Sequence, residues 1–286
     1  MIKKTAVVCV FLPLAIFSFS CKTTNVQDGK PSETFFSDEA AAFFNKGVDY
    51  HNEEKYGYAV DCFSEAIKIS RSYQSAYSAR GSSYYFLGKY SEAMSDFDYA
   101  ISLGPRDISW YALAYFMKGR IYNERGEYEK AVENYNISGG IMPFSAEKYG
   151  ERSYAYFHFG RMAEAFADMS MAIYLSPSDY GYLDSRGAIL YEMKLYKKAI
   201  KDFSDSLVLN PGNAHAATCI GTILKELEIY DVSLEYYNKA VGLDPEHVPA
   251  YQGRGGLYVI LAELSDDINE KNEYLEKSKN DFKKVR

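Results

Sequence analysis

The sequence has few of the residues that build catalytic or metal sites. Its four histidines and four cysteines occur in no HExxH or CxxC spacing, and no Walker A, dinucleotide-binding or GxSxG pattern occurs. Ser145–Lys148 matches SxxK, but the SDN and KTG elements of penicillin-recognising enzymes are absent, so we interpret this segment as a helix start. We interpret the histidines as surface or groove residues and expect no enzyme activity, cofactor or bound metal.

An excess of positive charge is also lacking. The formal net charge is −7, and it falls to −9 when residues 1–20, which contain two lysines, are removed. Proteins that bind nucleic acids usually carry a basic patch or stripe. We therefore predict no nucleic-acid partner.

No apolar run is long enough to form a retained membrane-spanning helix. The run at residues 5–19 has 15 residues, whereas a spanning helix needs about 20. Two lysines precede it, and the small residues Ser18 and Ser20 follow it, as in an export signal. We predict that residues 1–20 are a signal peptide that is removed.

Cys21 comes directly after Ser20. This junction resembles the lipobox of bacterial lipoprotein precursors, which implies that Cys21 becomes acylated and anchors the chain in the bacterial envelope, at the periplasmic face or the cell surface. Ser18 and Phe19 depart from the lipobox, which usually has an aliphatic residue three before the cysteine, and the junction also fits ordinary signal-peptidase cleavage. The mostly polar residues 21–37 are expected to form a flexible tether of roughly 20 Å.

The chain does contain a 34-residue repeat, marked in each unit by one small residue. These marker residues are Gly47, Gly81, Gly119, Ser153, Gly187, Gly221 and Gly255. Large side chains four before and three after most markers predict one face of a first helix. A second small residue twelve positions on, followed four later by a large one, predicts a second helix, and prolines end most units. We predict hairpins whose two helices touch at the marker residue.

This pattern resembles the tetratricopeptide repeat over residues 38–286. The resemblance implies an all-α, right-handed α-solenoid of about seven helix-turn-helix repeats. The repeats are predicted near residues 40–73, 74–107, 112–145, 146–179, 180–213, 214–247 and 248–286. Four inserted residues at Ile108–Tyr111 separate the second and third repeats. About eleven more, near Leu261–Asn272, are expected as a loop before a final capping helix.

The resemblance also implies that partner proteins bind in a concave groove lined by one stripe of the first helices. The predicted groove residues are Phe44, Val48, His51, Tyr85, Phe116, Arg120, Asn123, Tyr154, Phe157 and Tyr191. Chaperone adaptors of the family clamp a C-terminal carboxylate with Lys and Asn on this stripe. Phe44 and Val48 stand there instead, so this clamp is not expected. In an alternative interpretation, some of the aromatic residues pack between repeats.

The expected function is that of a membrane-anchored scaffold or adaptor in the bacterial envelope, which binds protein or peptide segments through the groove. The alternative is a surface-exposed lipoprotein adhesin that binds host components. Because large apolar surfaces seldom stay bare, the groove could also hold the tether through Phe35 and Phe36, or a second copy in a homo-oligomer.

Overall fold

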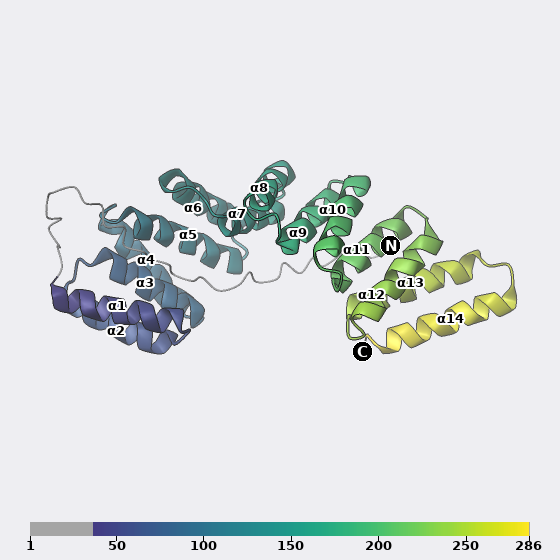
Figure 1. Ribbon diagram of the computed structural model, residues 1–286, viewed down its shortest axis with the longest axis horizontal. Coiled ribbons are helices and arrows are strands. Elements are labelled where there is room, and N and C mark those ends of the chain that lie inside the picture. Colours follow the sequence, from purple (N-terminus) through teal and green to yellow (C-terminus); the bar gives the residue numbers. More distant parts are fainter. Residues whose placement is uncertain (1–36, 286) are drawn as a thin grey trace. The chain divides into compact units, whose positions relative to one another are not determined.

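The structure is a computed structural model that describes residues 37–285. The predicted signal peptide, the predicted lipidation site Cys21 and all but the last residue of the predicted tether lie outside these residues. Helices dominate residues 37–285, which contain no β-strand (Figure 1). The predicted all-α fold is confirmed.

The chain divides into two compact units, residues 37–160 and residues 161–285 of the described part. We call them the N-terminal unit and the C-terminal unit. The N-terminal unit contains α1 (Asp38–Asn52), α2 (Tyr56–Ile69), α3 (Gln74–Phe86), α4 (Tyr90–Ser102), α5 (Ile108–Glu124), α6 (Tyr128–Ile141) and α7 (Ala146–His158). The C-terminal unit contains α8 (Met162–Leu175), α9 (Tyr180–Glu192), α10 (Tyr196–Leu209), α11 (Ala214–Glu226), α12 (Tyr230–Leu243), α13 (Val248–Leu264) and α14 (Ile268–Lys283).

Consecutive helices within each unit pack as antiparallel hairpins (Figure 1). The pairs are α1 with α2, α3 with α4 and α5 with α6 in the N-terminal unit, and α9 with α10, α11 with α12 and α13 with α14 in the C-terminal unit. Several starts are fixed by side-chain caps, because the first amides of a helix have no partner within it. The Ser37 hydroxyl accepts from the amide of Ala40, and the Asp107 carboxylate accepts from the amides of Ser109 and Trp110.

The marker glycines are the points at which the two helices of a hairpin touch. An alanine Cβ at Gly119 would lie 2.6 Å from the ring of Tyr135 on α6, and one at Gly47 would lie 2.6 Å from the ring of Phe63 on α2. Tyr135 and Phe63 are fully buried. The prediction that the markers are small because two helices meet there is confirmed.

The two insertions lengthen helices instead of forming loops. Residues 108–111 extend the start of α5, and the segment 261–272, which was expected to be a loop, mostly lengthens α13 and α14, leaving only residues 265–267 between them. The loop prediction for this segment is wrong. Gly255 still meets the ring of Phe282, 27 positions later, whereas the other marker glycines meet a ring 16 positions later. The eleven extra residues therefore form added helix beyond that contact.

An arginine before several marker residues joins neighbouring helices through a buried ion pair. The Arg80 guanidinium donates to both carboxylate oxygens of Asp96 on α4, at 2.8 Å each, and to the Ser64 hydroxyl on α2 at 3.1 Å. The same geometry recurs at Arg186 with Asp202 and at Arg254 with Asp281. Each of these guanidinium groups links three helices. The sequence analysis did not identify this role.

The steric role of the marker glycine predicts a stability difference between two glycines of the same hairpin. Gly119→Ala should destabilise the protein by about 1–3 kcal/mol, because its Cβ collides with the Tyr135 ring. Gly140→Ala, on α6 with nothing within 4 Å of its Cβ, should be neutral or stabilising by up to about 1 kcal/mol. Urea unfolding of both variants measures the difference. Equal changes in stability in the two variants would show that the contact between Gly119 and the Tyr135 ring does not require a glycine.

Candidate functional site

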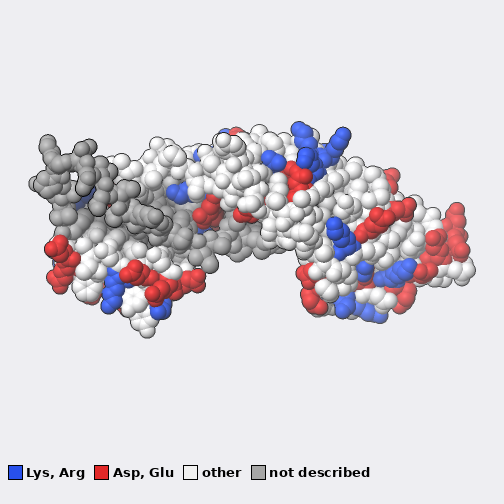
Figure 2. All heavy atoms as spheres, in the orientation of Figure 1, with Lys and Arg blue, Asp and Glu red and all other residues white. Residues whose placement is uncertain are grey.

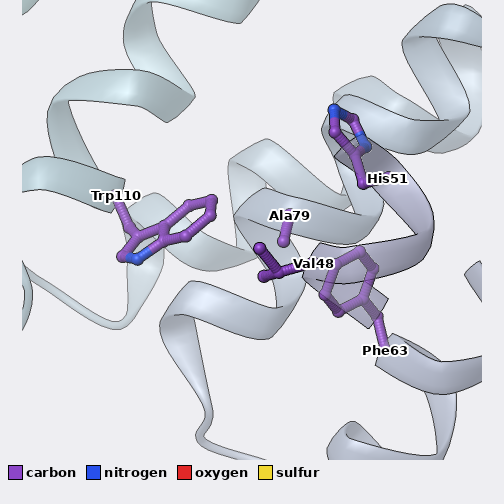
Figure 3. Close-up of a pocket in the computed structure, with 5 residues that line it drawn as sticks. All are labelled: Val48, His51, Phe63, Ala79 and Trp110. Atoms are coloured by element: carbon purple, nitrogen blue, oxygen red, sulfur yellow. The ribbon is translucent and has the colours of Figure 1, made fainter. Parts of the chain in front are cut away.

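The first part of the predicted stripe is filled by side chains of the protein itself. The Phe44 ring lies 5.1 Å from that of Tyr73 and 5.6 Å from that of Trp110, between ring centres. Val48 and Trp110 line a narrow apolar pocket beside it (Figure 3). Its interior is too narrow to hold a water molecule. Here the inserted Trp110 occupies the space that a partner side chain would need.

His51 is a buried packing residue and not a groove residue. Its side chain is 4% exposed, and its Nδ1 lies 2.8 Å from the Ser83 hydroxyl of α3. The rings of Tyr56 and Phe86 pack against it. Burial penalises the charged imidazolium and lowers the pKa of His51 to about 4, so the ring is neutral at pH 7.

Phe116 is also part of the core. It is 0% exposed, and its ring centre lies 5.3 Å from that of Tyr135. A partner cannot reach a side chain in this position, so the expectation that Phe116 lines an open groove is corrected. For Phe116 and Phe44 the structure agrees with the alternative interpretation, in which aromatic residues pack between repeats.

Arg120 lies at the centre of a partly buried charged site. Its Nε is 3.4 Å from a carboxylate oxygen of Glu151 on α7, and its guanidinium lies 4.9 Å from the ring centre of Tyr85 on α3. The Arg120 and Glu151 side chains are 13% and 20% exposed. The Tyr85 hydroxyl in turn lies 3.4 Å from Glu124. Arg120 and Tyr85, which were predicted as groove residues, therefore contact Glu151 and Glu124, which the sequence analysis did not include in the groove.

Two further charged residues come from the first turn of α7. Lys148 lies 5.2 Å from the ring centre of Phe116, and Glu147 interacts electrostatically with Arg120, Glu151 and Lys148. Burial, opposed by Arg120, raises the pKa of Glu147 to about 7 and also raises the pKa of Glu151. We call Arg120, Glu124, Glu147, Lys148 and Glu151 the charged cluster.

Asn123 connects the charged cluster to the hairpin core. Its Nδ2 donates to the Tyr135 hydroxyl at 2.9 Å and to the backbone oxygen of Glu151 at 3.5 Å. The Tyr135 hydroxyl also lies 3.4 Å from the Glu151 carboxylate. The Oδ1 of Asn123 is buried and has no hydrogen-bond partner among residues 37–285.

Of the remaining predicted groove residues, Tyr154 interacts electrostatically with Glu124 and Glu151 of the charged cluster. Tyr154 and Phe157 are half-buried on α7, next to the ring of His158. Tyr191 belongs to the C-terminal unit, where it is 8% exposed and its hydroxyl bonds to Glu226. Of the ten predicted groove residues, nine therefore belong to the N-terminal unit and only Tyr191 to the C-terminal unit.

The sequence analysis missed the carboxylates because they lie off the predicted stripe. Glu147 and Glu151 are one helical turn apart on α7, so both can face Arg120. This i, i+4 spacing was readable from the sequence. Their nearness to Arg120 depends on the packing of α7 against α6 and α5, which the spacing alone does not provide.

Other chemical sites were sought in the same residues. Among residues 37–285, no three His, Cys, Asp or Glu side chains are arranged to hold a metal ion. No helix within that range is long and apolar enough to cross a membrane. On the face in Figure 2, Lys and Arg gather over α10, and Asp and Glu gather at the end of the α13–α14 hairpin.

The fold and this site define a helical-repeat protein. The family model for the tetratricopeptide repeat matches residues 78–138, within α3 to α6, and residues 215–247, within α11 to α12. The chain therefore contains tetratricopeptide repeats, and this part of the sequence prediction is confirmed. Such repeats form a scaffold suited to protein–protein interaction.

Two curated relatives share part of the chain. A segment of 90 residues is 38% identical to Hsp70-Hsp90 organizing protein 3 of Arabidopsis thaliana, covering 32% of this chain and 15% of that protein. A segment of 133 residues is 26% identical to mitochondrial import receptor subunit TOM70 of Homo sapiens, covering 46% of this chain and 22% of that protein. The chain thus spans less than a quarter of either relative.

Solved structures share the fold at low sequence identity. A tetratricopeptide repeat protein from Cytophaga hutchinsonii superposes with a TM-score of 0.67 at 17% identity, covering 85% of this chain and 99% of the other. YrrB, described as a TPR protein with an unusual peptide-binding site, has a TM-score of 0.59 at 19% identity, covering 66% and 96%. PilF of Pseudomonas aeruginosa has a TM-score of 0.61 at 16% identity, covering 75% and 96%.

The raised pKa of Glu147 predicts a stability gain that depends on pH. The folded protein must ionise a buried carboxyl above pH 7, and each unit of pKa shift corresponds to about 1.4 kcal/mol. The pKa of Glu147 is higher in the folded state than in the unfolded state. The loss of folding stability caused by ionising Glu147 is therefore absent below about pH 4.5 and complete above pH 7. Glu147→Gln should therefore stabilise the protein by about 1–3 kcal/mol at pH 8 and by little at pH 4.5.

Urea unfolding at the two pH values measures this effect. Glu263→Gln, which removes the same charge from an exposed position on α13, should give no such difference between the pH values. A Glu147→Gln variant that is no more stable than the wild type at pH 8 would show that the carboxyl is adequately solvated or paired.

Proposed function

We propose that this protein is a lipid-anchored adaptor of the bacterial envelope that binds segments of partner proteins along the stripe at α3, α5 and α7. The observation that carries the proposal is the charged cluster around Arg120. The close contact of the α5–α6 hairpin is made by Gly119 and the Tyr135 ring, and Arg120, Glu147 and Glu151 are not part of that contact. Partly exposed charged and aromatic side chains of this kind are common where proteins recognise partners.

The names of related proteins support a binding role for this fold. YrrB is described as having a peptide-binding site, and one curated relative is named as an import receptor subunit. Neither relative identifies the partner of this chain.

The anchor part of the proposal rests on the sequence around Cys21. Residues 1–20 have the organisation of an export signal, and Ser20-Cys21 resembles a lipobox. A lipid at Cys21 followed by a polar tether would hold the repeats close to a membrane surface. We include both the periplasmic face and the cell surface in this proposal, and external protease treatment of intact cells distinguishes them.

Replacing the predicted lipidation site tests the anchor. Cys21→Ala should abolish metabolic labelling with a radioactive fatty acid and move the protein from the membrane fraction to the soluble fraction. Cys62→Ala, which changes a buried cysteine of α2, is the matched control and should remain labelled. A wild-type protein that takes up no label would refute the lipid anchor.

Photo-cross-linking tests the binding surface. p-Benzoylphenylalanine at Tyr154, a half-buried position on α7, should cross-link to partner protein in cells that produce the full chain. The same residue at Tyr58, which is 63% exposed on α2, should give no cross-link, because it lies on a second helix away from the stripe. Cross-links from Tyr58 with none from Tyr154 would contradict the proposed surface.

A further inference from the structure

The charged cluster contains three carboxylates and two cations. Glu147 and Glu151 repel each other, and Glu124 adds to the repulsion at Glu151. Arg120 approaches Glu151 at 3.4 Å and has no shorter ion pair among residues 37–285. Lys148 is also partly buried, and burial lowers its pKa. The negative charge is therefore not fully compensated within the N-terminal unit.

A second observation shows that the site also lacks a hydrogen-bond donor. Asn123 is 8% exposed, and its amide lies against the Tyr135 hydroxyl and the backbone of Glu151. Its Oδ1 finds no donor among residues 37–285. A buried acceptor without a donor lowers the stability of the folded protein. The Glu147 and Glu151 carboxylates nearby are only partly buried, so an N–H donor that approaches the cluster can pair with them.

We infer that the charged cluster binds a lysine or arginine side chain of a partner segment, with the cation placed against Glu147 and Glu151. This inference rests on the proposed adaptor function and adds the chemistry of the ligand. The Arg120 guanidinium pairs with Glu151 at 3.4 Å. The partial exposure of the Arg120 and Glu151 side chains leaves room for a group to approach.

Other ligand chemistries fit less well. A carboxylate would add negative charge to a site that already holds three, and an apolar side chain would bury those carboxylates further without pairing them. A cation is the one ligand that lowers the cost of ionising both buried glutamates. Burial raises the pKa of Glu147 to about 7, which supports this conclusion because a nearby cation would favour the ionised carboxyl.

Model peptides test the inference on the full mature chain. The probes are an acetylated, amidated octapeptide of alternating lysine and alanine and its counterpart with glutamate in place of lysine. Fluorescence anisotropy at pH 8 and about 50 mM salt should detect binding of the lysine peptide and much weaker binding of the glutamate peptide. Glu147→Gln combined with Glu151→Gln should weaken lysine-peptide binding roughly tenfold or more.

A matched double variant controls for overall charge. Glu263→Gln with Glu270→Gln removes two exposed carboxylates from α13 and α14 and should change the affinity less than about twofold. Wild-type affinity should rise roughly fivefold to tenfold from pH 6 to pH 8 as Glu147 ionises, and the cluster variant should lose this rise. The pH profile uses the unmodified protein, so it tests the site even if the cluster variant misfolds.

Three results would overturn the inference. They are equal binding of the lysine and glutamate peptides, a flat wild-type pH profile, and an equal loss of affinity in the matched variant. If these occur while Tyr154 still cross-links to a partner, the adaptor function stands and the ligand is not basic. If Tyr154 gives no cross-link and the lysine peptide still binds at the charged cluster, the adaptor function fails and the cluster remains a cation site.

Discussion

Each complete hairpin within a unit depends on one steric constraint. The first helix has a glycine where it meets the second helix, and the glycine backbone packs directly against a buried aromatic ring of that helix. At Gly47, Gly119 and Gly187 an added Cβ would come within 2.9 Å of the facing ring, closer than carbon atoms approach in folded proteins. The close approach of the helices fills the interior with large rings and leaves little empty space. The rest of the first helix is then oriented by this contact, which determines which of its residues face the neighbouring repeat.

The ion pairs made by the arginine before the marker glycine stabilise the same packing of the two helices. Because Arg186 immediately precedes the marker Gly187, its direction is set by the glycine contact, and it reaches both carboxylate oxygens of Asp202 and the Ser170 hydroxyl. At the C-terminal hairpin, Gly255 with Phe282 and Arg254 with Asp281 both keep their partners despite eleven extra residues. On α13 both contacts lie before the inserted residues, and on α14 both lie near the end of the helix. The insertion therefore lengthens the two helices without altering which residues pair between them.

The sequence predicted the hairpins well because periodic spacing is a local signal that survives in every repeat. The marker spacing located the close contacts between the two helices of a hairpin. The site was predicted only in part, because it depends on neighbours from different helices. Phe116 and His51 have the spacing of groove residues, yet the next helix covers both. Glu147 and Glu151 had no place in the repeat pattern, and only the packing of α7 brings them to Arg120.

Arg80 and Arg120 contact carboxylates in different ways, and the difference supports the proposed binding role of Arg120. Arg80 makes two bonds of 2.8 Å to one carboxylate, so the charges are matched and the bidentate geometry is complete. Arg120 makes a single contact of 3.4 Å to Glu151 in a cluster with additional carboxylates. A purely structural cluster would gain stability by losing Glu147, whose ionisation opposes folding at neutral pH. A carboxylate that opposes folding is expected at a site where a bound ligand supplies a cation.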